Sequence, residues 1–157
     1  MSVISLFHSQ VKKVDTSDYT IIRIEKVNGL SDTASLSKTQ FRSYAADFLS
    51  LPDVADKDRK ENYEISRSFD SLLNNLVITY TALEPEEEIS RETLLWAPDS
   101  LGNSILKTIY INRVSERKDT LIEKEMTWHM DRGFQVITKT QTEKGPETVR
   151  RVQVRWH

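Results

Sequence analysis

The chain has 157 residues, a net charge of −2 and no cysteine, and its length fits a single domain of about 100–200 residues. The balanced charge argues against a surface built for nucleic acid. The lack of cysteine excludes disulfides, thiolate metal centres and a cysteine nucleophile. With only four glycines, the chain has little material for a glycine-rich phosphate loop.

The chain opens on a short apolar run that gives way to Lys12 and Lys13. Within a single domain of residues 1–157, we interpret residues 1–16 as an N-terminal segment that could be flexible. A secretory signal would place charge before a longer apolar region, and no stretch reaches the roughly 18 apolar residues of a membrane span. A cytoplasmic location is therefore favoured, and an exported protein whose signal or anchor has been trimmed is the alternative.

A strand and a helix are predicted next. Tyr19–Val27 is rich in β-branched residues and ends at Asn28-Gly29, which predicts a strand and a turn. Ser37 and Gln40 have the spacing of a capping box, which predicts a helix over about 37–50. Its apolar positions form one stripe: Phe41, Tyr44, Ala45, Phe48 and Leu49.

Seven more strands are predicted after residue 62, separated by segments with turn composition. Their candidates are Tyr63–Phe69, Leu76–Leu83, Ile89–Trp96, Ile105–Val114, Thr120–Met130, Phe134–Thr142 and Thr148–Trp156. Because the loops are too short for crossover helices, neighbouring strands must pair antiparallel. The fold class is therefore mainly β (α+β), an up-and-down meander of about eight strands with one helix after the first.

Alternation along the strands predicts one dry and one wet face, and two architectures satisfy it. In 120–130, Met126 and Trp128 share one side, and Glu123 and Glu125 share the other. Either the strands close into a barrel whose end the helix covers, or a strongly curved open sheet holds the helix on its concave face. In the barrel, 148–156 pairs with 19–27, and in the open sheet it is an edge. We favour the barrel-like closure.

The strand–helix–meander order is similar to that of the fatty-acid-binding members of the calycin group, which carry two helices and more strands. It also resembles the cystatin-like order, which has fewer strands. The Gly-x-Trp of lipocalins is absent from the first strand. These resemblances concern the fold and imply little about function.

No catalytic motif is present, so the chain is not predicted to be an enzyme, and no catalytic residue, metal or cofactor is assigned. His129 lies within a strand, but Glu125 on the same face is about 13 Å away along it. The C-terminal strands carry an excess of basic residues. A basic stripe that meets phosphate or acidic partners could be formed by Arg151 and Arg155 with Lys139 and Arg132. The alternative, which we favour, is that acidic residues facing these side chains cancel their charge.

The aromatic residues carry the functional prediction. Aromatic walls with a few polar groups are typical of small-molecule sites and also of ordinary cores. We predict a non-catalytic β-rich binding module that holds a small hydrophobic or amphipathic ligand between helix and sheet. The alternative is a structural or assembly protein that contacts another protein through an exposed sheet face or edge strand. The candidate ligand-binding residues are Phe41, Tyr44, Phe48, Trp96, Tyr110, Trp128 and Trp156.

Overall fold

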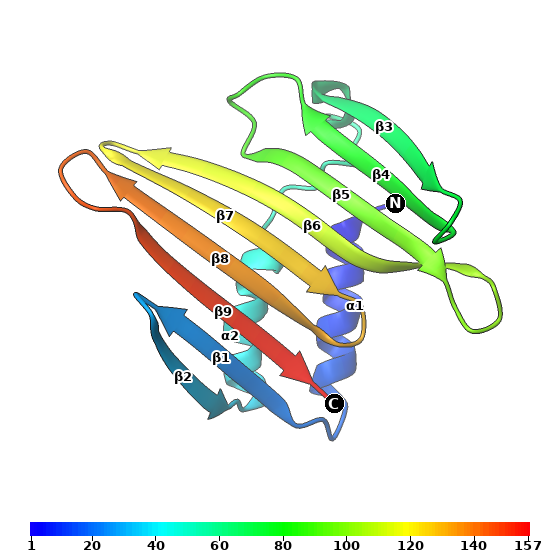
Figure 1. Cartoon of the computed structure of the whole chain (residues 1–157), viewed down its shortest axis with the longest axis horizontal. Helices are drawn as coiled ribbons and strands as arrows, with labels where there is room; N and C mark the ends of the chain where they lie inside the picture. Colours follow the sequence, from blue (N-terminus) through cyan, green and yellow to red (C-terminus); the bar gives the residue numbers. More distant parts are fainter.

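The computed structural model describes all 157 residues and consists of one nine-stranded antiparallel sheet with two helices on one face (Figure 1). The sheet order is β2-β1-β9-β8-β7-β6-β5-β4-β3. The elements are α1 (Val3–Asp15), β1 (Ile21–Val27), β2 (Leu30–Ser35), α2 (Lys38–Leu49), a 3-10 turn (Lys60–Asn62), β3 (Tyr63–Asp70), β4 (Asn75–Ala82), β5 (Ile89–Pro98), β6 (Ser104–Arg117), β7 (Thr120–His129), β8 (Gly133–Thr142) and β9 (Thr148–Trp156). The predicted mainly β meander, with a helix after the first strand, is confirmed.

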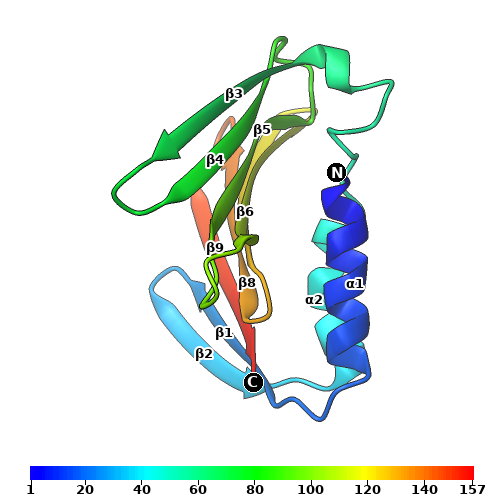
Figure 2. The ribbon, with the colours of Figure 1, turned by 90° about the vertical axis from the view of Figure 1, so that its right-hand side faces the viewer.

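The sheet is open, so the favoured barrel-like closure is wrong. The predicted pairing of the first and last strands does occur, since Ile21 lies opposite Trp156 and Val27 opposite Arg150. The chain then turns at Asn28 and Gly29, both with positive φ, and returns as β2. This extra strand covers the free side of β1, and the edges β2 and β3 remain unjoined. In Figure 2 the β1–β2 and β3–β4 hairpins lean away from the helices.

The structure has two helices, where one was predicted. Residues 3–15, for which the sequence predicts no element, form α1. Its apolar stripe of Val3, Phe7, Val11 and Val14 is buried against the sheet. The Ser2 hydroxyl caps its first turn by accepting from the Ser5 N–H. Neither helix combines the length and the apolar character that a membrane crossing requires.

The helix α2 begins with the predicted capping box. The Ser37 hydroxyl accepts from the Gln40 N–H at 3.1 Å, and the Gln40 side chain accepts from the Ser37 N–H at 2.8 Å. These two bonds satisfy donors that the helix start would leave unpaired. The stripe residues Phe41, Ala45 and Phe48 are fully buried, so the predicted face of this helix is confirmed.

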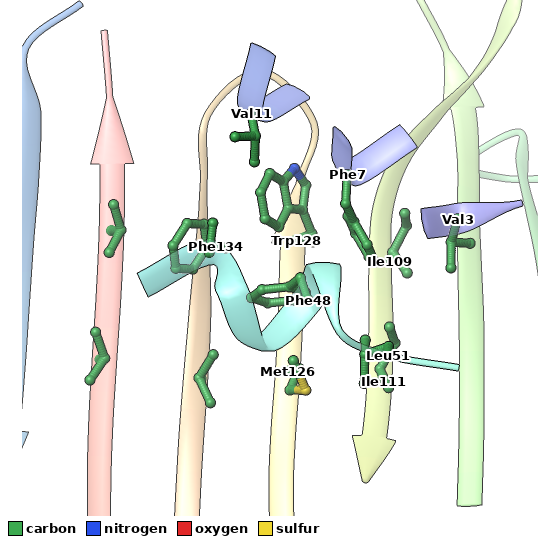
Figure 3. Close-up of a cluster of buried hydrophobic side chains, with 14 of the residues drawn as sticks. Val3, Phe7, Val11, Phe48, Leu51, Ile109, Ile111, Met126, Trp128 and Phe134 are labelled. Carbon is green, nitrogen blue, oxygen red and sulfur yellow. The ribbon is translucent and has the colours of Figure 1, made fainter. Parts of the chain in front are cut away.

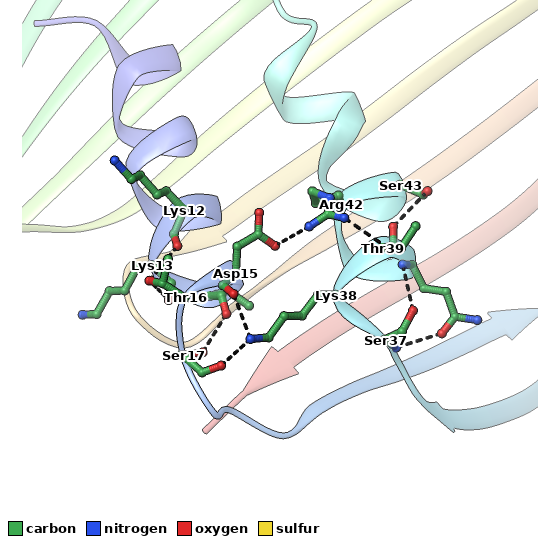
Figure 4. Close-up of polar contacts among 12 residues, drawn as sticks. Lys12, Lys13, Asp15, Thr16, Ser17, Ser37, Lys38, Thr39, Arg42 and Ser43 are labelled. Carbon is green, nitrogen blue, oxygen red and sulfur yellow. Dashed lines mark hydrogen bonds and ion pairs between the residues drawn. The ribbon is translucent and has the colours of Figure 1, made fainter.

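Polar contacts join the end of α1 to the start of α2 (Figure 4). The Lys38 ammonium donates to the carbonyl oxygens of Asp15 at 2.8 Å and Ser17 at 2.5 Å. Arg42 pairs with the Asp15 carboxylate at 2.9 Å. A cation here satisfies carbonyls that the helix end leaves unpaired and complements its negative dipole end. The two helices therefore lie side by side (Figures 1 and 2).

The core between helices and sheet is an aromatic cluster centred on Trp128 (Figure 3). The Trp128 ring lies 5.0 Å from Phe7 of α1, 4.9 Å from Phe48 of α2 and 5.0 Å from Phe134 of β8, between ring centroids. Trp156 of β9 follows at 5.8 Å. All five side chains are buried. The dry face predicted from the alternation in β7 is the face that the helices cover.

Candidate functional site

The seven aromatic residues predicted to bind a ligand lie in different environments. Trp96 is half-buried at the border of the core, whereas Tyr110 lies on the opposite face of the sheet with 40% exposure. Tyr44 lines a cavity. The remaining four are buried and pack within the aromatic core: Phe41, Phe48, Trp128 and Trp156.

A cavity of about 310 Å³ lies beside that core, between α2 and strands β7, β8 and β9. Its floor is apolar and consists of the buried side chains of Phe134, Val136 and Val152. Its walls and rim are polar apart from Tyr44. These further lining residues are Ser43, Tyr44, Asp47, Lys124, Thr138 and Arg150.

The register of the sheet explains the change from an apolar floor to a polar rim. One row across β8 and β7 pairs Phe134 with Trp128, and both contact the Phe48 ring of α2. The next row pairs Val136 with Met126, and the row after it pairs Thr138 with Lys124. The aromatic side chains of α2 fill the space over the first row. Val136 of the second row and Thr138 and Lys124 of the third face the cavity, which we call the α2 cavity.

The charged rim of the α2 cavity is held by ion pairs. The Lys124 ammonium pairs with Asp47 of α2 at 3.0 Å, and Arg150 pairs with Glu25 at 2.5 Å. A second hollow of about 320 Å³ lies on the other side of the Lys124–Asp47 pair and includes Arg113. Arg113 stands opposite Lys124 in the sheet. A cationic row therefore borders the apolar floor.

Sequence reasoning missed the floor and the rim of the α2 cavity. Val136 and Val152 belong to the dry face, and the alternation identifies that face correctly. The sequence does contain a signal for the rim. Lys124 and Arg150 follow the same two-residue period as Met126 and Val152, so the dry face changes there from apolar to cationic side chains. A cation on the dry face marks the place where the core ends.

His129 lies on the face opposite the helices, and no acid joins it. Its Nδ1 lies 3.3 Å from the Thr108 hydroxyl. His129 lines a hollow on this face together with Arg132 and Arg155. Burial, followed by the charge of Arg132, lowers the pKa of His129. Of the predicted basic stripe, only Lys139 is paired, with Glu125 at 2.8 Å.

No family model, curated protein or solved structure matches this chain. The chemistry of the lining residues is therefore what points to a class of ligand. An apolar floor beside cations, with a few hydroxyl groups, fits a molecule that has one apolar and one polar end.

A buried acid lies on the same face, outside the α2 cavity. Glu92 of β5 is 2% exposed, and one of its carboxylate oxygens has no hydrogen-bond partner. It stands opposite Ile111 and Tyr80 on the neighbouring strands. Burial, and then the negative charge of Asp53, raise the pKa of Glu92 to about 7. The folded protein therefore takes up this proton more readily than the unfolded chain.

We predict that Glu92 makes the free energy of unfolding fall as the pH rises from about 4.5 to about 7. This loss of stability is absent at low pH, where Glu92 is protonated in both the folded protein and the unfolded chain. It is complete at high pH, where Glu92 is ionised in both. Its size is on the order of 3 kcal/mol. Relative to the parent, Glu92→Gln should therefore gain stability across this window in urea titrations. Glu64→Gln on the exposed strand β3 is the control, and a Glu92→Gln difference that does not change with pH would contradict the assignment.

Proposed function

We propose that the chain is a non-catalytic binding module that holds a small amphipathic ligand in the α2 cavity, with an anionic head at the rim. One observation carries the proposal. On the face that lines the cavity, the row of the sheet with buried Val136 and Val152 is followed directly by the row with Thr138, Lys124 and Arg150.

The floor supplies the affinity for the apolar part. Phe134, Val136 and Val152 present ring and methyl groups, and each methylene group that a ligand buries there contributes about 0.8 kcal/mol. The volume of about 310 Å³ lies at the lower end of the usual range for ligand pockets. A single ring system or a short alkyl chain fits this space better than a two-chain lipid.

The rim supplies the preference for an anion. The Lys124 ammonium has three donors and makes one hydrogen bond, to Asp47. Arg150 uses its Nε for Glu25, and its two terminal nitrogens make no hydrogen bond within the chain. Both cations therefore retain donors for a carboxylate or sulfonate. A charge-assisted hydrogen bond of this kind is about twice as strong as a neutral one.

We predict that the anionic dye anilinonaphthalene sulfonate binds the folded protein saturably in this cavity. Thr138→Trp places a large ring on the lining and should weaken dye binding by about tenfold or more, a loss of at least 1.4 kcal/mol. Ile137→Trp, the neighbouring position on the opposite face of β8, is the matched control and should bind like the parent. Fluorescence titration measures both, with near-ultraviolet circular dichroism as the check on folding. Equal binding by Thr138→Trp and the parent would contradict the site.

A second candidate function is self-assembly through the edge strand β3. Only its first residue, Tyr63, is buried. On the strand and its hairpin, Phe69 is 61% exposed, Leu73 65% and Leu72 95%. Monomeric proteins usually protect such edges with charge, proline or a bulge. Glu64 and Arg67 put charge on β3, but the exposed apolar side chains gathered at its hairpin end favour pairing with the same strand of a second copy.

If β3 mediates self-assembly, the mass of the parent should rise with protein concentration in sedimentation equilibrium. Phe69→Lys should restore the monomer, because it adds a charge at the edge without touching the core. Leu30→Lys on the other edge, β2, is the control and should associate like the parent. A parent that stays monomeric at all concentrations would contradict this candidate.

A further inference from the structure

The face of the sheet opposite the helices has a hollow of about 400 Å³ at the turn between β7 and β8. We call it the outer hollow. Gly133 lies between His129 of β7 and Arg155 of β9, which are its direct partners in the sheet register. Arg132 and Gln153 also line it.

Gly133 leaves this row of the sheet without one side chain. His129 and Arg155 stand two strands apart, about 10 Å, and Gly133 between them fills none of that width. A Cβ built on Gly133 would collide with the carbonyl oxygen of Val154. The close approach of β8 and β9 therefore requires glycine here, and the gap is a fixed feature of the backbone.

The helix α1 holds the adjoining turn in place. The Asp131 carboxylate accepts from Lys13 at 2.6 Å and from Gln10 at 3.1 Å, and the Gln10 side chain accepts from the Asp131 N–H at 2.7 Å. The hydrogen bond from Lys13 is the main reason that the pKa of Asp131 is lowered. Asp131 is therefore paired with α1 and forms no ion pair with its neighbour Arg132.

The outer hollow concentrates positive hydrogen-bond donors without a carboxylate in its lining. Neither Arg132 nor Arg155 takes part in an ion pair, whereas Lys139 and Arg150 on the same two strands are paired. The His129 ring lies beside them with its Nδ1 3.3 Å from the Thr108 hydroxyl, and in the tautomer whose ring proton is on Nε2 that nitrogen is a third donor. Two guanidinium groups and an imidazole are a suitable set for a tetrahedral oxyanion.

A row of uncharged polar side chains continues from the hollow across the same face. Gln153 stands opposite Gln135, and Gln135 stands opposite Thr127. All three are half-buried, so their amide and hydroxyl groups form a surface of hydrogen-bond donors and acceptors. Such a surface suits the hydroxyl groups of a ligand rather than an apolar chain.

We propose that the outer hollow binds the phosphate group of a small phosphorylated polyhydroxyl compound, such as a sugar phosphate. Arg132, Arg155 and His129 hold the phosphate over Gly133, and Gln153 and its row contact the hydroxyl groups. This site lies on the face opposite the α2 cavity and is independent of the ligand proposed there.

The test is titration of the isotope-labelled full chain with inorganic phosphate, glucose 6-phosphate and glucose, followed by nuclear magnetic resonance. We expect both phosphates to shift the Gly133 and Arg155 amides saturably, with tighter binding of glucose 6-phosphate, and glucose to be weakest. Arg155→Gln should weaken phosphate binding about tenfold or more, as expected for the loss of a charged hydrogen-bonded contact. Dye binding in the α2 cavity should not change, which separates the two sites.

Arg151→Gln is the matched control. Arg151 lies on the same strand and face as Arg155, is exposed, and makes no ion pair. Its replacement should leave phosphate affinity unchanged. Equal weakening by the two substitutions would mean attraction by diffuse charge and would overturn the site, as would the absence of saturable shifts at Gly133. If glucose 6-phosphate binds no more tightly than inorganic phosphate, the role assigned to the Gln153 row is wrong.

Discussion

The packing of Phe7 and Phe48 against Trp128 is the contact that joins the three parts of this fold. Phe7 comes from α1, Phe48 from α2 and Trp128 from the middle of the sheet, and their rings lie 4.9–5.2 Å apart between centroids. The sheet is open, so it cannot bury its dry face by curling on itself. The two helices must cover that face, and the aromatic cluster is where both of them meet it.

Both proposed sites lie where the size of the side chains on a face of the sheet changes from one row to the next. On the helix side, the aromatic row of Trp128 and Phe134 is followed by a row with Val136 and then by a row with Thr138 and Lys124. The cavity begins where the rings end. On the opposite side, the missing side chain of Gly133 leaves the outer hollow between His129 and Arg155. The aromatic core thus sets where the α2 cavity begins, and the glycine row sets where the outer hollow lies.

Much of this fold could be predicted from local patterns. The capping box at Ser37 and the two-residue alternation around Trp128 depend on neighbours in sequence, and both were interpreted correctly. The strand β2 was missed because all but one of its residues are exposed, so burial leaves no alternation in it. The helix α1 was missed although Val3, Phe7 and Val11 have helical spacing, because polar residues interrupt a short stretch at the start of the chain.

The candidate site was less predictable for a physical reason. Alternation identifies the face on which Phe48 and Val152 lie, but not which part of that face a helix covers. That depends on how α2 crosses the sheet, which contacts between residues far apart in sequence determine. For the same reason, the choice between barrel and open sheet depended on β2, which pairs only with β1.

The most direct test of this account is the free energy of unfolding of Phe48→Ala, measured by urea denaturation. The account predicts a loss of about 3–5 kcal/mol, the range for an aromatic ring removed from a packed core. Tyr110→Ala removes a ring from the opposite face, where the side chain is 40% exposed, and should cost about 1 kcal/mol or less. If Phe48→Ala is no more destabilising than Tyr110→Ala, the aromatic cluster does not hold the helices to the sheet.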